Sequence, residues 1–208
     1  MTENDRVDRL LDRYGETYAH QAGIRLADRP QPLYQLLVLV KLLSTRISAS
    51  IAVAAARELF KAGLTSPRAM VAADVHTRWH ALAAAHYIRY GGPAVRQLEE
   101  GAQLALDRWG GDLRRMHKAA AGDRAALRTS LTEFPGIGPT GADIYLREAQ
   151  AVWPDVHPYL DARVTAAAKA VRLPSSPAKL AELVPPDRLP ELAAAVLRGS
   201  RDRSLTTA

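Results

Sequence analysis

The sequence contains no cysteine among its 208 residues. Disulfide bonds, thiolate zinc sites and iron–sulfur clusters held by cysteine are therefore excluded. Long apolar runs are absent as well, because the longest, residues 33–43, is interrupted by Lys41 and is too short to cross a bilayer. The N-terminal residues are charged and lack the apolar segment of a secretory signal. These features predict a cytoplasmic protein without a membrane partner.

Acidic residues are outnumbered by basic ones, 22 to 28, which gives a net charge of +6. This balance favours polyanionic partners, with nucleic acid first and an anionic membrane surface second. The alternative is a solvated, arginine-rich surface with no particular partner. Only 6% of the residues are aromatic, whereas alanine is very frequent. The composition predicts an all-α protein with one large domain or two small lobes.

Glycine and proline punctuate a series of helical segments, and we find neither an internal repeat nor a low-complexity linker. The segment ADRPQP is expected to be a loop, and GGP after Tyr90 is expected to break a helix. The longer predicted helices cover residues 4–15, 33–45, 49–62, 77–90, 94–109, 123–134, 140–152 and 161–173. Shorter helices are predicted from near residue 66, at 177–183 and at 187–198.

The stretch EFPGIGPTGADIYL, residues 133–146, combines three glycines and two prolines between helical segments. Gly136 and Gly138 permit positive φ angles and a close approach of the backbone. Pro139 suits the first turn of the following helix, where its missing N–H has no cost. The N–H groups of that helix start would form an anion site suited to a DNA phosphate. An ordinary tight turn between packed helices is the alternative.

LTEFPGIGPTGADIYL resembles the hairpin of the endonuclease III superfamily of base-excision DNA glycosylases (HhH-GPD), roughly L-P-G-V-G-x-K-T-A. Further stretches are similar to that family in the same order along the chain, over about residues 30–200: PLYQLLVLVKLLSTRIS, LTSPRAMVAA, GDRAALRTSLTEFPGIG, YLDARVTAAAKAVRL and VPPDRLPELAAAVLRGSR. This resemblance implies an all-α, two-lobed DNA glycosylase fold with a helix-hairpin-helix motif. Residues 33–152 would form a helical barrel lobe with the hairpin at about 127–148. Residues 1–32 and 153–208 would form the second lobe, without an iron–sulfur loop.

Asp161 matches the catalytic aspartate of the family, which begins a helix. A carboxylate beside the sugar stabilises the positive charge that develops when an N-glycosidic bond breaks, and it can activate water. Asp161 is the expected N-cap of its helix, and the helix N-terminus would favour the ionised carboxylate. The apolar spacing of Val164, Ala167 and Val171 supports this register.

The match around Asp161 departs from the family pattern. An arginine commonly follows the aspartate by five positions in the family, whereas Arg163 follows by two. Aligning on the arginine instead would put Pro158 at the catalytic position. Asp155 is a further carboxylate in the same loop. Catalysis by Asp161, catalysis by Asp155 and the absence of a catalytic carboxylate therefore remain open.

Thr140 stands where strand-cleaving members of the family carry a nucleophilic lysine. Because threonine cannot form a Schiff base, the resemblance implies a monofunctional glycosylase in which water attacks the sugar. Lys41 could replace that lysine, but its helical spacing predicts a solvated or snorkelling side chain. Lys118 lies in a basic turn and is expected to be a surface residue or a phosphate contact.

The resemblance also implies a set of DNA-binding residues. Arg46 falls at the position of a family glutamine that fills the gap left by an extruded base; the alternative is a surface arginine after a helix end. The segment HYIRYGGP resembles one that lines the mouth of the base pocket. Its tyrosines, Tyr87 and Tyr90, could stack on a flipped base or pack in the core. The hairpin contacts would be Gly136, Ile137, Gly138, Thr140 and Gly141.

Metal ligands are not indicated by the sequence. His76 and His80 are four residues apart, but no carboxylate lies at a useful spacing from them. We therefore expect no metal site and no cofactor, with a monovalent cation at the hairpin as the one further candidate. The expected partner is double-stranded DNA, bound by a monomer.

Three functions follow from these patterns. The first is a DNA-repair enzyme, a monofunctional DNA glycosylase that hydrolyses the bond to a damaged or mismatched base. The second is a catalytically degenerate protein that binds DNA structure through the hairpin without excising a base. The third is a helical protein–protein module with a chance hairpin. The sequence does not identify a lesion.

Overall fold

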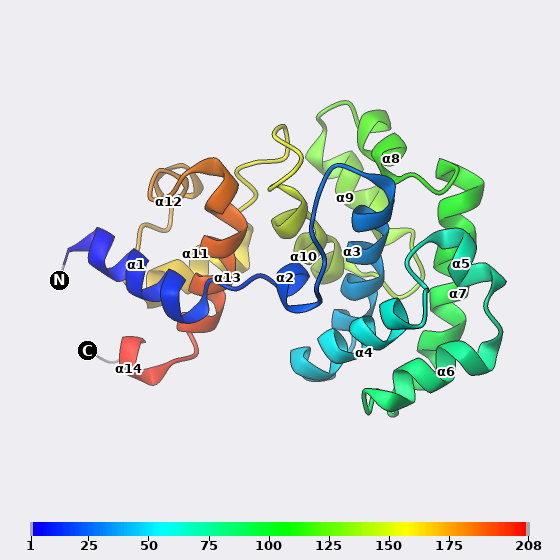
Figure 1. Cartoon of the computed structure of the whole chain (residues 1–208). Helices are drawn as coiled ribbons and strands as arrows, with labels where there is room; N and C mark the ends of the chain where they lie inside the picture. Colours follow the sequence, from blue (N-terminus) through cyan, green and yellow to red (C-terminus); the bar gives the residue numbers. More distant parts are fainter. Residues whose placement is uncertain (1, 207–208) are drawn as a thin grey trace. The chain divides into compact units, whose positions relative to one another are not determined.

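The computed structural model describes residues 2–206, and within this range the chain forms only helices joined by turns and loops (Figure 1). The predicted all-α class is confirmed. None of the helices in residues 2–206 is long and apolar enough to cross a lipid bilayer. The elements are α1 (Glu3–Tyr14), α2 (Tyr18–Gln21), α3 (Pro30–Leu43), α4 (Ala49–Lys61), α5 (Pro67–Ala72), α6 (Val75–Ala84), α7 (Gly91–Trp109), α8 (Leu113–Ala119), α9 (Arg124–Thr132), α10 (Pro139–Ala149), α11 (Ala162–Ala170), α12 (Pro177–Ala181), the 3₁₀ helix η1 (Pro186–Arg188), α13 (Leu189–Gly199) and α14 (Arg203–Thr206).

The chain divides into two compact units, which we name by what they contain. The hairpin unit is Ala19–Tyr145, and the terminal unit combines Met1–Tyr18 with Leu146–Ala208. The sequence placed the lobe boundaries after residues 32 and 152, and residues 1, 207 and 208 of the expected second lobe lie outside the described residues. The division between the units falls inside α10, so this one helix contributes to both.

The core of the hairpin unit is built on α3, which packs against α4, while α5 and α6 pack against α7. Eight of the nine residues from Leu33 to Lys41 are buried, as expected for a helix that is apolar on most sides. The helix begins at Pro30, although the sequence predicted a loop there. Pro30 and Pro32 both lie in its first turn, where a proline interrupts no hydrogen bond of the helix.

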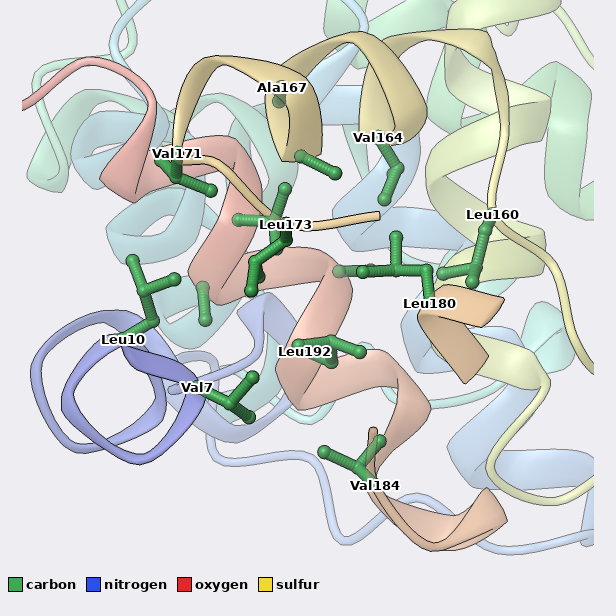
Figure 2. Close-up of a cluster of buried hydrophobic side chains, with 14 of the residues drawn as sticks. Val7, Leu10, Leu160, Val164, Ala167, Val171, Leu173, Leu180, Val184 and Leu192 are labelled. Carbon is green, nitrogen blue, oxygen red and sulfur yellow. The ribbon is translucent and has the colours of Figure 1, made fainter. Parts of the chain in front are cut away.

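The core of the terminal unit is a single apolar cluster drawn in Figure 2. Val7 and Leu10 of α1 meet the buried face of α11 and the residues of α13. Val164, Ala167 and Val171 all lie in this cluster, so the spacing that predicted the inner face of α11 is confirmed. The carboxyl group at the start of α11 is therefore held on a helix whose rotation is fixed by its packing.

Three further local predictions were wrong. The predicted helix over residues 77–90 ends at Ala84, and the glycines expected to break a helix instead begin α7. Gly91 can start that helix because its missing side chain makes room for the Trp79 ring, which would lie 2.6 Å from an added Cβ. The basic turn predicted around Lys118 is the helix α8, capped by the side chain of Asp112.

Candidate functional site

The hairpin turn, residues 134–138, joins α9 to the start of α10 in the hairpin unit. The Ile137 amide donates to the Phe134 carbonyl at 3.0 Å, with Pro135 and Gly136 as the central residues of a β-turn. Gly136 has φ +78°, which a type II turn requires at this position. An added Cβ at Gly136 would also lie 2.6 Å from Lys41 Cε. Glycine is therefore needed both for the turn and for the close approach to α3.

The helix start beyond the turn is open to solvent. Gly138, Pro139 and Thr140 are exposed, whereas Ile137 is buried beneath them. The first amides of a helix have no acceptor within the helix, and the helix dipole adds a positive potential at this end. The geometry expected of a phosphate-binding hairpin is thus present, and Thr140 is an exposed residue of its first turn.

An ion pair joins the two helices of the hairpin. Arg128 Nε lies 2.6 Å from Asp143 Oδ1, so a side chain of α9 is bonded to one of α10. The Asp143 side chain is mostly buried, which protects this bond from competing water. The pair links α9 to α10 across the turn.

The Arg46 loop, residues 44–48, lies directly against the hairpin. A Cβ added at Gly141 would collide with Ser44 Oγ and would lie 3.0 Å from Ile137 Cγ2. The backbone of α10 can therefore reach the loop only because residue 141 is glycine. Arg46 itself is exposed, and within residues 2–206 its side chain has no hydrogen bond or ion pair.

The two tyrosines proposed for a base pocket differ in their surroundings. Tyr87 has 0% relative exposure, and its hydroxyl lies 2.6 Å from Thr45 Oγ1. Its ring therefore belongs to the core in this structure, which is the packing alternative, and is not available for stacking on a base. Tyr90 is half-buried, with the Arg89 guanidinium 5.5 Å from its ring centroid. A stacking role for Tyr90 stays a prediction.

Lys41 is buried, contrary to the prediction of a solvated side chain. Its relative exposure is 4%, and no other described residue forms a hydrogen bond or an ion pair with it. Burial lowers the pKa of Lys41 to about 8. A small cavity of about 20 Å³ lies beside Lys41, with room for about one water. Its walls are formed by Tyr34, Gln97, apolar residues of α3 and α7, and residues of the hairpin turn. The hairpin turn covers the Lys41 side chain, and the spacing of residues along α3 could not predict this contact.

Lys118 is exposed in the last turn of α8, in the same unit as the hairpin. Its neighbour His117 is half-buried, so the basic end of this helix presents the lysine to solvent. Both sequence interpretations, a surface residue and a phosphate contact, are compatible with this position. The DNA contact stays a prediction.

Asp161 is the N-cap of α11, in the terminal unit, as predicted. Its Oδ1 accepts hydrogen bonds from the amides of Arg163 and Val164, at 2.8 and 3.2 Å. Its Oδ2 lies 3.1 Å from Arg147 Nε, and both side chains are about one-tenth exposed. The two atoms form an ion pair, but their alignment makes no hydrogen bond, and Oδ2 has no hydrogen-bond partner within the described chain.

Two residues that the sequence analysis missed hold this carboxylate in place. Arg147 extends from the last turns of α10 as its ionic partner. Gln150 is buried, accepts from the Tyr159 amide at 2.7 Å and donates to the Tyr159 carbonyl at 3.2 Å. The loop before Asp161 is thereby fastened to the end of α10. The only signal in the sequence was the run REAQ, residues 147–150, which places three polar residues at the end of α10.

Asp155, the other carboxylate considered in the loop before α11, is exposed. Within residues 2–206 no group of three or more histidine, aspartate or glutamate residues is arranged to hold a metal ion. A monovalent cation at the hairpin carbonyls stays a prediction.

No protein-family model and no curated protein matches the sequence. Solved structures are similar to the chain. One is a trapped covalent intermediate of endonuclease III with DNA, an estranged-adenine complex; it is 15% identical, with 95% of this chain and 85% of that chain covered at a TM-score of 0.48. Another is a non-covalent endonuclease III–DNA complex; it is 14% identical, with the same coverage and a TM-score of 0.49.

Proposed function

We propose that the protein binds double-stranded DNA and hydrolyses the N-glycosidic bond of a damaged or mismatched base. In this proposal it is a monofunctional DNA glycosylase of base-excision repair. The observation that carries the proposal is the packing of Ser44 against Gly141. This contact joins an exposed helix start and an exposed arginine in one compact unit, where both can meet the same duplex.

Binding would use the two exposed elements differently. The start of α10 would hold a backbone phosphate through its amides, which fixes position without reading sequence. Arg46 would enter the duplex and hydrogen-bond the base left without a partner. Enzymes that act on a base extrude it from the stack, and an inserted side chain keeps the gap open.

Bond cleavage would depend on Asp161. Departure of the base builds positive charge on the sugar, and a nearby carboxylate stabilises that charge. Oδ1 of Asp161 is occupied by the helix cap, and Oδ2 is buried beside Arg147. Catalysis would therefore require this ion pair to open, so that Oδ2 can face the sugar or accept a proton from water. Thr140 offers no amine, so water would be the attacking group.

The decisive test is base release from duplex oligonucleotides that carry alkylated, oxidised, deaminated or mismatched bases. We expect release of at least one base by the unaltered protein and loss of release in Asp161→Asn. Asparagine caps helices about as well as aspartate, so this variant removes the charge while it keeps the cap. A panel without any released base would refute the proposal, and borohydride trapping of a covalent complex would refute the role given to water.

A second function has a specific observation in its favour. Both carboxylate oxygens of Asp161 have structural partners, the cap amides and Arg147, so the residue could be purely structural. The protein would then recognise DNA structure without excising a base. Salt-sensitive duplex binding with no base release from the same panel would establish this alternative.

A further inference from the structure

A buried group of three oxygen atoms anchors one side of the Arg46 loop. The Tyr87 hydroxyl lies 2.6 Å from Thr45 Oγ1 and 3.2 Å from the Leu42 carbonyl oxygen. Thr45 Oγ1 lies 3.0 Å from the same carbonyl. Leu42 is in the last turns of α3, so the triad ties the loop residue Thr45 to both α3 and Tyr87.

The two hydroxyls of this triad supply two protons, and the carbonyl only accepts, so two of the three contacts can be hydrogen bonds at one time. Either Thr45 donates to the carbonyl and Tyr87 donates to Thr45, or Tyr87 donates to the carbonyl and Thr45 donates to Tyr87. Both arrangements require both hydroxyls. Loss of either one leaves the remaining polar atoms of the triad with fewer partners in a buried place.

Tyr87 is directed inward by an unfavourable backbone conformation next to it. His86 has φ +58°, in the left-handed region that residues other than glycine seldom adopt. The Tyr87 amide donates to the Leu82 carbonyl at 2.9 Å, which ends α6 with this sharp change of direction. His86 and Ile88 are exposed, whereas Tyr87 between them is buried. His86 is the left-handed residue of a Schellman-type cap at the end of α6, and this helix end turns the chain so that Tyr87 enters the core.

Arg46 stands at the tip of the turn that Thr45 begins. The Ile47 amide donates to the Thr45 carbonyl at 2.9 Å, which closes a three-residue turn centred on Arg46. On the other side of Thr45, Ser44 packs against Gly141 and its Oγ bonds the Val40 carbonyl at 2.7 Å. The residues before the arginine are thus fixed twice, by the hairpin and by Tyr87.

We propose that Tyr87, acting through Thr45, is a positioning residue that holds the Arg46 turn in the conformation required to enter DNA. This role rests on the proposed function, because it has meaning only if Arg46 is inserted into a duplex. An anchored turn reduces the conformational freedom that the loop loses on insertion. Tyr87 itself touches neither the base nor the sugar.

The first measurement needs no DNA. Hydrogen exchange of peptides covering residues 42–48 should be faster in Tyr87→Phe and in Thr45→Val, by about tenfold if one buried hydrogen bond is lost. Thr45→Ser keeps the hydroxyl and should exchange as the unaltered protein does. Peptides from α13 in the terminal unit report global opening and should not change. Unchanged exchange at residues 42–48 in both hydroxyl-deleted variants would overturn the proposal.

The second measurement is a double-mutant cycle between Tyr87→Phe and Arg46→Ala, with binding to a duplex containing a tetrahydrofuran abasic analogue. We expect Arg46→Ala to weaken binding about tenfold in the unaltered background, the scale of a lost base contact, and by less than about threefold once Tyr87→Phe is present. Thr45→Ser should preserve the full Arg46 effect. If the losses of binding free energy caused by Tyr87→Phe and Arg46→Ala are strictly additive, Tyr87 is merely structural and the positioning role is overturned.

The two measurements also separate this inference from the proposed function. If the unaltered protein binds no duplex, the proposed function and the positioning role are both overturned, whatever the exchange data show. If Arg46→Ala changes nothing in any background, the insertion of Arg46 and the positioning role are overturned, and base release still tests the glycosylase activity. If binding and the Arg46 effect are present but the cycle shows no coupling, only the positioning role is overturned.

Discussion

Ser44 Oγ occupies the space that a side chain at Gly141 would need, so the Arg46 loop and the first turns of α10 are in direct contact. The contact joins two exposed elements that are about a hundred residues apart in the sequence. The packing of these two segments therefore fixes where Arg46 lies relative to the start of α10. The same contact gives the first prediction.

Gly141→Ala should destabilise the protein even though alanine is the better helix former. The gain in helix propensity is at most about 1 kcal/mol, whereas overpacking against Ser44 and Ile137 costs about 1–3 kcal/mol. We expect a net loss of about 1 kcal/mol or more in the free energy of unfolding measured with urea. Gly138→Ala is the matched control, because an added Cβ there meets nothing within 4 Å. Adding Ser44→Ala to Gly141→Ala should restore part of the loss.

Lys41→Met should stabilise the protein at neutral pH. Burial lowers the pKa of Lys41 from 10.5 to about 8, so the charged form is disfavoured in the folded state. The unfolded chain binds more protons between these two values, and the free energy of unfolding therefore rises with pH through this window. Below pH 8, the charged Lys41 lowers the free energy of unfolding by an amount on the order of 3 kcal/mol. Methionine has a similar length and no charge, so the substitution removes this cost.

The pH dependence supplies the check on Lys41. The difference in unfolding free energy between Lys41→Met and the unaltered protein should be largest at pH 7 and should shrink by pH 9.5. Lys61 is exposed and serves as the control position, where the same substitution should have a small, pH-independent effect. A lysine with an ordinary pKa would give no slope in this range.

Gln150→Leu should destabilise the terminal unit and loosen the start of α11. The side chain bonds both the amide and the carbonyl of Tyr159, and its removal leaves two partly buried backbone groups without this partner. We expect a loss of about 2–6 kcal/mol, at about 1–3 kcal/mol for each group. Hydrogen exchange at the amides of Arg163 and Val164, which Asp161 caps, should accelerate. Gln103→Leu, at an exposed position, should leave both measurements unchanged.

Lys118→Ala tests the reach of the DNA interface beyond the hairpin. If Lys118 contacts one phosphate, the slope of log affinity against log salt should become less steep by about 1, with a similar loss for every duplex sequence. Lys179, exposed on α12 of the terminal unit, is the control substitution. An unchanged salt slope in Lys118→Ala would place this residue outside the interface.

The sequence by itself determined the parts of this protein that depend on local chemistry. An all-α chain follows from its composition and spacing, the type II turn from the adjacent Pro135 and Gly136, and the cap of α11 from Asp161 before an apolar period. These features need only neighbours along the chain. The predicted helix ends were less accurate where packing between helices decides them. Gly91 begins α7, and it can do so because the Trp79 ring occupies the space that a side chain at residue 91 would need.

Only the tertiary structure decided the environment of each candidate side chain. Lys41 looked solvated by its spacing, yet the hairpin turn from the far end of the same unit covers it. Tyr87 could have lined a pocket, but its ring is buried and its hydroxyl contacts Thr45 of the Arg46 loop. Arg147 and Gln150 gave little local signal, because their partners lie beyond the end of their helix. Burial and pairing depend on which segments meet in space, and the pattern along one segment does not contain that information.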